Sequence, residues 1–229
     1  MPVPGASPEY RDLSDWAVTK ILEAIKEGAI QPGERLTELE VAAQFGVSRA
    51  PVRDAIHKLE KLGVVVRDGS RATYVRSWDI KDVYDLVVVL DSLVSLSVRL
   101  AAAQITPTQL DALEAILEET KTALAQDPDN LLAQAALDAK FHVLIARATG
   151  NRMLEEMIEN LWLPHQLYHK EFLGRVGRAY SLQEHTELLE ALRSGNPAEA
   201  EACARRHAQA GQKALEEAIH SRAAVLEPR

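Results

Sequence analysis

The strand signal of this chain is confined to one short segment. Two β-prone runs, residues 64–67 and 71–75, flank an Asp-Gly turn, which is the pattern of a β-hairpin. Three helical patterns precede this segment, and from residue 80 onward the apolar residues recur at helical spacing to the C-terminal region. The sequence therefore predicts a mainly α fold with a single small hairpin.

The region before residue 77 predicts a winged helix-turn-helix domain over residues 10–76. A first helix is expected from Trp16 to Glu27, where Gly28 ends it. Thr37 and Glu40 form a capping-box pattern for a second helix that ends near Phe45, and Ser48 is the expected N-cap of a third helix that ends at residue 62. Helix, helix, turn, helix and hairpin is the element order of that fold.

The region from residue 80 to 221 predicts an all-α helical bundle. Capping-box patterns occur at Thr106 with Gln109, at Asn196 with Glu199, and at Ser181 with Glu184. The domain boundary is expected near residues 77–79. The expected helices cover residues 80–104, 107–126, 130–148, 151–173, 182–194 and 198–221.

Charge is distributed unevenly along the 229 residues. The formal net charge is −8, and all the excess acid lies after residue 76; residues 44–76 instead carry seven Lys and Arg against three Asp and Glu, a net charge of +4. The only basic segment thus coincides with the predicted third helix and hairpin. The single cysteine, Cys203, excludes an internal disulfide, and the longest apolar run, residues 86–90, is too short to span a membrane. We expect a cytoplasmic protein without membrane partners.

Arginines in the predicted third helix are the candidate base-reading residues. Arg49 and Arg53 are four residues apart, so they project from one helix face near its N-terminal end. The planar guanidinium can bond guanine O6 and N7 together. The alternative is a solvated face in which these arginines pair with nearby carboxylates. Arg67 and Arg71 flank the hairpin tip at Gly69, which predicts either a groove or phosphate contact or an ordinary charged turn.

Four residues of the second region have the chemistry of metal ligands. Three neutral imidazoles and a carboxylate suit zinc, with nickel and manganese as alternatives. Taken singly, a histidine in such a helix is more often a structural core residue than a metal ligand. Two further histidines, His165 and His169, are four residues apart and belong either to an amphipathic helix face or to an effector cavity. The candidate ligands are Asp138, His142, His185 and His207.

The segment IQPGERLTELEVAAQFGVSRAPVRDAIHKLEKLGVV resembles the winged-helix domain of the GntR family of bacterial transcriptional regulators. The resemblance covers about residues 15–76, and GVSRAPVRDA is its most specific part. It implies DNA contacts at Ser48, Arg49 and Arg53 and places Gly69 in the wing. Members of the FadR type often carry an arginine in the second helix, where this chain has Leu39 and Glu40; Arg35 is the candidate substitute.

The segments LDAKFHVLIARATGN, SLQEHTELLEAL and ACARRHA resemble the FCD effector-binding domain that accompanies this winged helix. The resemblance covers roughly residues 80–221 and implies that the four candidate ligands hold a divalent metal. Such domains usually carry an arginine and a glutamate in their first helix, where this chain has Val87 and Asp91. The missing arginine removes one cation that would hold a carboxylate effector.

The sequence thus favours a DNA-binding transcriptional regulator, which in this family is most often a repressor. Double-stranded DNA with a palindromic operator, a small-molecule effector such as a carboxylate, and a second copy of the chain are the expected partners. A metal-dependent, hydrolase-like enzyme that carries a DNA-binding domain is one alternative. A structural nucleoid protein that binds DNA without sequence preference is another. No catalytic residues are predicted, so we expect a protein that is not an enzyme.

Overall fold

The computed structural model describes residues 8–69, 72–173 and 182–226. The chain divides into two compact units, Met1–Trp78 and Asp79–Arg229. The first unit contains the small sheet and three helices, and the second contains helices only in its described part. The predicted mainly α fold, with an N-terminal winged helix-turn-helix and a C-terminal helical bundle, is confirmed.

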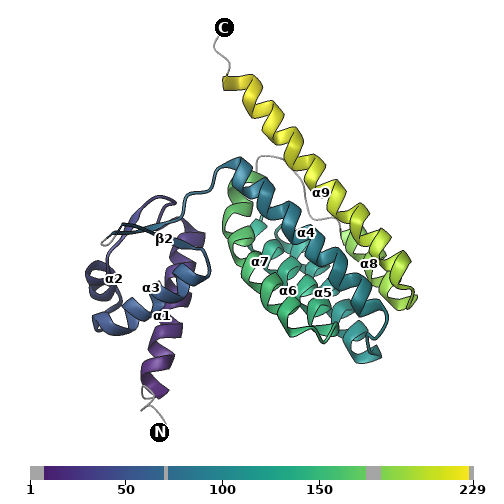
Figure 1. The fold of residues 1–229 in the computed structure, drawn as a ribbon, viewed down its shortest axis with the longest axis horizontal. Helices are drawn as coiled ribbons and strands as arrows, with labels where there is room; N and C mark the ends of the chain where they lie inside the picture. Colours follow the sequence, from purple (N-terminus) through teal and green to yellow (C-terminus); the bar gives the residue numbers. More distant parts are fainter. Residues whose placement is uncertain (1–7, 70–71, 174–181, 227–229) are drawn as a thin grey trace. The chain divides into compact units, whose positions relative to one another are not determined.

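The N-terminal unit packs two helices against a third (Figure 1). Apolar residues at helical spacing meet in its core, and the residues at 0% exposure include Ile21, Val52, Leu59 and Val64. Deep burial of these side chains holds the third helix in place. The helices are α1 (Pro8–Glu27), α2 (Glu38–Phe45) and α3 (Arg49–Lys61).

The starts of these helices differ in detail from the prediction. Helix α1 begins at Pro8, two turns before the predicted Trp16, because a proline in the first turn needs no intrahelical N–H partner. The Thr37 hydroxyl accepts the Glu40 backbone N–H at 3.2 Å, but the Glu40 carboxylate contacts that same hydroxyl. Ser48 occupies the N-cap of α3 without a side-chain capping bond. Its hydroxyl is therefore not used within the helix.

Three antiparallel strands form the sheet in the order β1, β3, β2. The predicted hairpin is confirmed as β2 (Val65–Asp68) and β3 (Ala72–Val75). Strand β1 (Arg35–Leu36) was not predicted, because two residues are too few to show alternation. Pairing of Arg35 with Tyr74 in β3 leaves Arg35 exposed, while Leu36 is buried.

Two glycines make tight turns that a side chain would strain. Gly46 ends α2 with φ +67°, and its N–H bonds back to carbonyls of that helix. Gly69 follows β2 with φ +60°. Both φ values lie in the left-handed region, which glycine adopts without steric cost. Gly46 therefore permits the turn between α2 and α3, and Gly69 permits the turn after β2.

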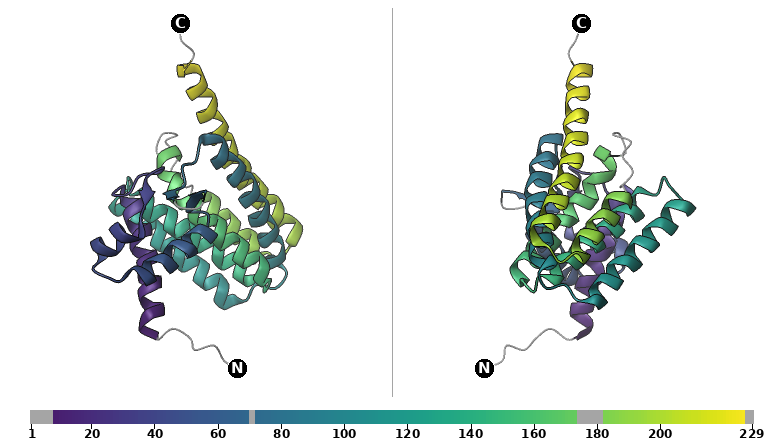
Figure 2. Two further views of the ribbon diagram at one scale, coloured as in Figure 1. Left: turned by 60° about the vertical axis from the view of Figure 1, so that its left-hand side comes forward. Right: turned by 90° about the vertical axis from the view of Figure 1, so that its right-hand side faces the viewer.

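The helical unit is built from antiparallel neighbours. Helix α9 lies along α4, and α5 packs on α6, which packs on α7 (Figures 1 and 2). Side-chain contacts join α4 to α9: Tyr84 Oη donates to Glu216 at 2.9 Å, and Gln212 Nε2 donates to Asp91 at 2.8 Å. Arg99 also pairs with Glu201 at 3.4 Å. The helices are α4 (Ile80–Ala102), α5 (Pro107–Gln126), α6 (Leu131–Ala148), α7 (Arg152–Leu173), α8 (Leu182–Arg193) and α9 (Pro197–Leu226).

Capping and burial explain these helices. Asp79 at the start of α4 and Thr106 at the start of α5 each form a complete capping box. Asn196 accepts the backbone N–H of Ala198 at 3.1 Å, so it caps α9. Cys203 is 6% exposed and packs in the core, as expected of a small apolar residue. Among the described residues, no helix is long and apolar enough to cross a lipid bilayer.

Candidate DNA interface and metal centre

Helix α3 presents the predicted arginines to solvent. Arg49 and Arg53 are both exposed and lie one turn apart at the start of the helix, next to the exposed Ser48. The Arg49 guanidinium pairs with Glu38 of α2 at 3.1 Å. In the part of the chain that the structure describes, Arg53 makes no side-chain hydrogen bond or ion pair. Arg53 can therefore contact a ligand directly, whereas Arg49 must first break its surface ion pair with Glu38.

The remaining predicted DNA-binding residues lie in or near the sheet. Arg35 is exposed in β1, and Gly69 is exposed after β2. Arg71 lies outside the described residues. The Arg67 guanidinium already has partners within the unit: it bonds Glu60 at 3.1 Å and the His57 ring at 3.1 Å. These bonds link β2 to α3, and Arg67 would have to break them to contact a phosphate.

The four predicted metal ligands come together inside the helical unit. Asp138 and His142 lie one turn apart on α6, His185 comes from α8, and His207 comes from α9. His142 Nε2 lies 3.2 Å from His185 Nε2, and His185 Nε2 lies 3.1 Å from Asp138 Oδ1. One ligand nitrogen from each of the three histidines lies within 4.8 Å of the others. Residues up to 69 positions apart in sequence thus form one cluster.

The geometry of this cluster fits a divalent transition metal. Two nitrogens bound tetrahedrally to zinc at about 2.0–2.1 Å stand roughly 3.3 Å apart, close to the spacing of His142 Nε2 and His185 Nε2, 3.2 Å. Asp138, His142 and His185 are at most 6% exposed. Buried imidazoles and a carboxylate require compensation for lost hydration, and a shared cation would supply it.

Electrostatics prepare these groups for a cation. Burial opposes ionisation of Asp138, but hydrogen bonds and charge from His142 and His185 outweigh it and hold the pKa of that carboxyl well below its usual 3.8. Burial lowers the pKa of His142 below 6.5, against the opposing effect of Asp138. An ionised carboxylate beside a neutral imidazole is the protonation state that metal ligands need.

Glu184 contacts one of the candidate metal ligands. Its carboxylate lies 3.0 Å from His207 Nδ1. Ser181, the other half of the predicted capping box, lies outside the described residues, so the box stays a prediction. The contact with His207 was not predicted, and only the position of Glu184 next to His185 signals it in the sequence.

Aromatic rings of α7 border the cluster. The Trp162 ring lies 5.2 Å from the His142 ring and 4.9 Å from the His165 ring, centroid to centroid. Burial lowers the pKa of His165 to about 4, so its imidazole is neutral at neutral pH. The side chain of His169 lies outside the described part of the structure. His165 thus belongs to the surroundings of the cluster and not to an exposed helix face.

Asp91 places a second carboxyl group in the same interior. Burial raises its pKa to about 7, the Gln212 hydrogen bond opposes this, and the charge of Asp138 adds to it. Val87, one turn earlier on α4, supplies no charge. Among the described residues, the buried polar and charged side chains include no lysine or arginine. A bound metal would therefore be the main positive charge available to an anionic effector here.

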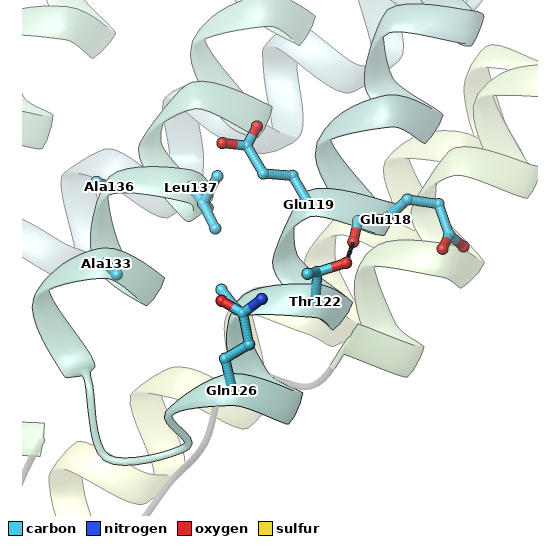
Figure 3. A pocket seen from close by; sticks show the side chains of 8 residues that line it. Glu118, Glu119, Thr122, Gln126, Ala133, Ala136 and Leu137 are labelled. Carbon is cyan, nitrogen blue, oxygen red and sulfur yellow. Dashed lines mark hydrogen bonds between the residues drawn. The ribbon is translucent and has the colours of Figure 1, made fainter.

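A shallow groove runs between α5 and α6, separate from the ligand set (Figure 3). It has a volume of about 710 Å³, and its lining includes Glu118, Glu119, Thr122, Ala136 and Leu137. Small side chains line one wall and two carboxylates the other. Its described lining residues include no histidine, lysine or arginine.

Comparison with known families identifies a family for each of the two units. A winged helix-turn-helix followed by a helical bundle defines a class of DNA-binding regulators. Residues 13–75 match the model described as "Bacterial regulatory proteins, gntR family", and residues 85–210 match the FCD domain model. The FCD match alone covers more than half of the chain. The chain belongs to the GntR family of transcriptional regulators and carries a C-terminal FCD domain.

Individual relatives and a solved structure are similar to this chain over most of its length. The chain is 30% identical over 178 residues to the uncharacterized HTH-type transcriptional regulator YdhC of Bacillus subtilis, covering 77% of this chain and 79% of YdhC. It is 31% identical over 195 residues to the Uxu operon regulator of Haemophilus influenzae, covering 77% and 71%. The solved structure of Escherichia coli McbR/YncC shares the fold with TM-score 0.72 at 22% identity, over 90% of this chain and 97% of that one. The YdhC and Uxu relatives are named as regulators.

Proposed function

We propose that this protein is a metal-dependent transcriptional repressor. Two copies bind a palindromic operator through their winged helices, and a small-molecule effector binds at the metal of the helical unit and releases the DNA. The observation that carries the proposal is the convergence of four metal-ligand side chains in the unit that follows a winged helix with a free Arg53. Zinc is the expected metal, and an effector oxygen, such as that of a carboxylate, would complete its coordination.

The proposed switch depends on differential affinity. An effector shifts the DNA-binding equilibrium only if it binds the released form better than the DNA-bound form. Action on chromosomal DNA places this activity in the cytoplasm. We assign no residue a catalytic role as acid, base or nucleophile. Binding to an operator is the activity of a regulator, and hydrolysis does not require it. An effector that releases the protein from the operator and is not itself chemically converted would distinguish a repressor from an enzyme.

Replacing Arg53 by alanine is expected to weaken binding to the cognate operator by about 1–3 kcal/mol, or roughly 5- to 150-fold. The reason is that Arg53 is exposed at the start of α3 and has no competing partner among the described residues. Fluorescence anisotropy on an operator selected from random duplexes measures the change. The matched control is Lys61→Ala, which removes the same charge from the exposed C-terminal end of α3.

Random DNA distinguishes the two kinds of contact. A base contact by Arg53 predicts a much smaller loss on random duplexes than on the operator. Equal losses on both duplexes would make Arg53 a phosphate contact. Operator affinity unchanged by Arg53→Ala, and also by Arg49→Ala, would overturn the assignment of α3 as the recognition helix.

The proposed dimer is supported by an apolar patch on α7. Met153 and Met157 lie one turn apart and are 67% and 44% exposed. Large apolar side chains at such exposure mark contact surfaces, and two-fold symmetry would place the same patch of a second copy opposite. We expect the double variant Met153→Glu, Met157→Glu to sediment as a monomer and to lose operator affinity, because four buried carboxylates would face one another.

A variant in the groove between α5 and α6 serves as the control. Thr122→Glu adds a charge to the groove between α5 and α6 and is expected to leave the dimer intact. Dissociation by Thr122→Glu, with the methionine double variant still dimeric, would move the interface to that groove. Sedimentation velocity at several protein concentrations decides between these results.

A further inference from the structure

Glu184 occupies a specific place relative to the cluster. It directly precedes His185 in the first turn of α8, and consecutive residues of a helix point about 100° apart. His185 is therefore turned into the core, at 3% exposure, while the Glu184 side chain, 26% exposed, reaches α9. There its Oε2 lies 3.0 Å from Nδ1 of His207.

This contact selects the ring nitrogen that can bind a metal. A neutral imidazole carries one proton, and a carboxylate accepts that proton's hydrogen bond. With Nδ1–H of His207 donating to Glu184, Nε2 keeps its lone pair. Metal ligation requires such an unprotonated nitrogen. The carboxylate also draws the ring into one orientation and makes Nε2 more electron-rich.

The other histidines of the cluster are held differently. His142 and His185 face each other and Asp138 within 3.1–3.5 Å in the core, and His142 Nδ1 is buried without a hydrogen-bond partner among the described residues. His207, with its side chain 19% exposed, is less enclosed by packing. Its ring is the one whose orientation depends most on a side-chain partner.

Charge balance gives Glu184 a second role. A divalent cation beside Asp138 alone retains a net charge of +1, and Glu184 within hydrogen-bond distance of a ligand brings the sum to zero. A carboxylate that is hydrogen-bonded to a ligand thus adds attraction between the site and a divalent cation.

We propose that Glu184 is a positioning residue for the metal: it holds His207 as the Nδ1–H tautomer, with Nε2 directed at the ion, and thereby sets metal affinity. This inference rests on the proposed function, because it presupposes the metal site. An ordinary ion pair between α8 and α9 would use the same contact but would leave metal affinity and tautomer independent of Glu184.

The test measures zinc affinity of the full-length protein by competition with a chelator of known affinity. Glu184→Ala is expected to weaken zinc binding 10- to 100-fold. Glu184→Gln is expected to recover part of the loss, because its amide oxygen can still accept the Nδ1–H although the charge is gone. Glu187→Ala is the matched control: Glu187 is exposed on the same helix, bonds Gln183 at 3.0 Å, and its loss should not change zinc affinity.

Nitrogen-15 NMR of the histidine rings provides a readout that a purely structural role would not move. In metal-free wild type, His207 should be the Nδ1–H tautomer, and in Glu184→Ala it should shift toward Nε2–H. Circular dichroism checks that each variant is folded. Equal zinc affinity in Glu184→Ala and wild type, with zinc binding lost in His185→Ala, would overturn the positioning role and leave the metal site standing. Absence of zinc binding in wild type itself would overturn both.

Discussion

Replacing His185 by alanine is expected to abolish stoichiometric zinc binding. His185 Nε2 contacts both Asp138 and His142, so its loss removes a ligand and opens the centre of the cluster. Zinc at 1,000 times its dissociation constant stabilises a folded protein by about 4 kcal/mol. We expect that stabilisation in wild type and little of it in the variant, measured as the zinc-dependent change in free energy of unfolding.

The design separates loss of metal from loss of packing. Because the zinc-induced change is compared within each protein, the cost of the cavity left by His185 cancels. His57→Ala, in the winged unit, is the matched control and should retain the full zinc response. A metabolite screen by thermal shift, run on zinc-loaded wild type and on His185→Ala, should find effectors that stabilise only the former. A normal effector response without bound metal would reduce the cluster to core packing.

Asparagine at position 91 is expected to stabilise the protein in alkaline but not in acidic solution. Burial raises the folded-state pKa of Asp91 from 3.8 to about 7, so the folded state binds more protons than the unfolded state between these values. Wild-type stability therefore falls as pH rises through this interval and levels off above it. A shift of about three pKa units corresponds to about 4 kcal/mol at pH 8.

Urea unfolding of metal-free protein at pH 5 and pH 8 tests this linkage. The stability advantage of Asp91→Asn over wild type should grow by about 3 kcal/mol between the two pH values. Asp85→Asn is the control, since Asp85 lies on the same helix, is exposed and pairs with Lys81. Its difference from wild type should not grow in this way. An advantage of Asp91→Asn that does not vary with pH would show that Asp91 is not desolvated.

Local patterns were sufficient to predict most elements of the fold. Helix caps, the Asp-Gly turn and apolar spacing depend on residues only a few positions apart, so α4 to α8 begin and end within two residues of the expected positions. Helix α9 instead ends at Leu226, five residues beyond its expected end. Strand β1 escaped prediction because its pairing with Tyr74 is a distant contact. The early start of α1 escaped because its first turns lack the apolar spacing on which the prediction relied.

The candidate site was predictable only in part. Helical spacing places Asp138 beside His142, but only the resemblance joined His185 and His207 to them. The bond of Arg67 to Glu60, the contact of Glu184 with His207 and the burial of Asp91 are set by tertiary packing. Local patterns had assigned Arg67 to the hairpin turn, Glu184 to a helix cap and Asp91 to a position where the family usually has a glutamate. The contacts of Glu184 and Asp91 involve residues that are distant in sequence, whereas Arg67 and Glu60 are only seven positions apart.

Side-chain hydrogen bonds connect α9, which carries His207, with α4, the helix that follows the winged unit. His207 and Gln212 lie on the same helix, Gln212 donates to Asp91, and Tyr84 on α4 donates to Glu216 further along α9. Helix α4 begins only two residues after Trp78, at the end of the DNA-binding unit. In the proposed switch, an effector that displaced α9 at the metal would either break these bonds or move α4 with α9. Helix α4 would then pass the change along the chain toward the winged unit.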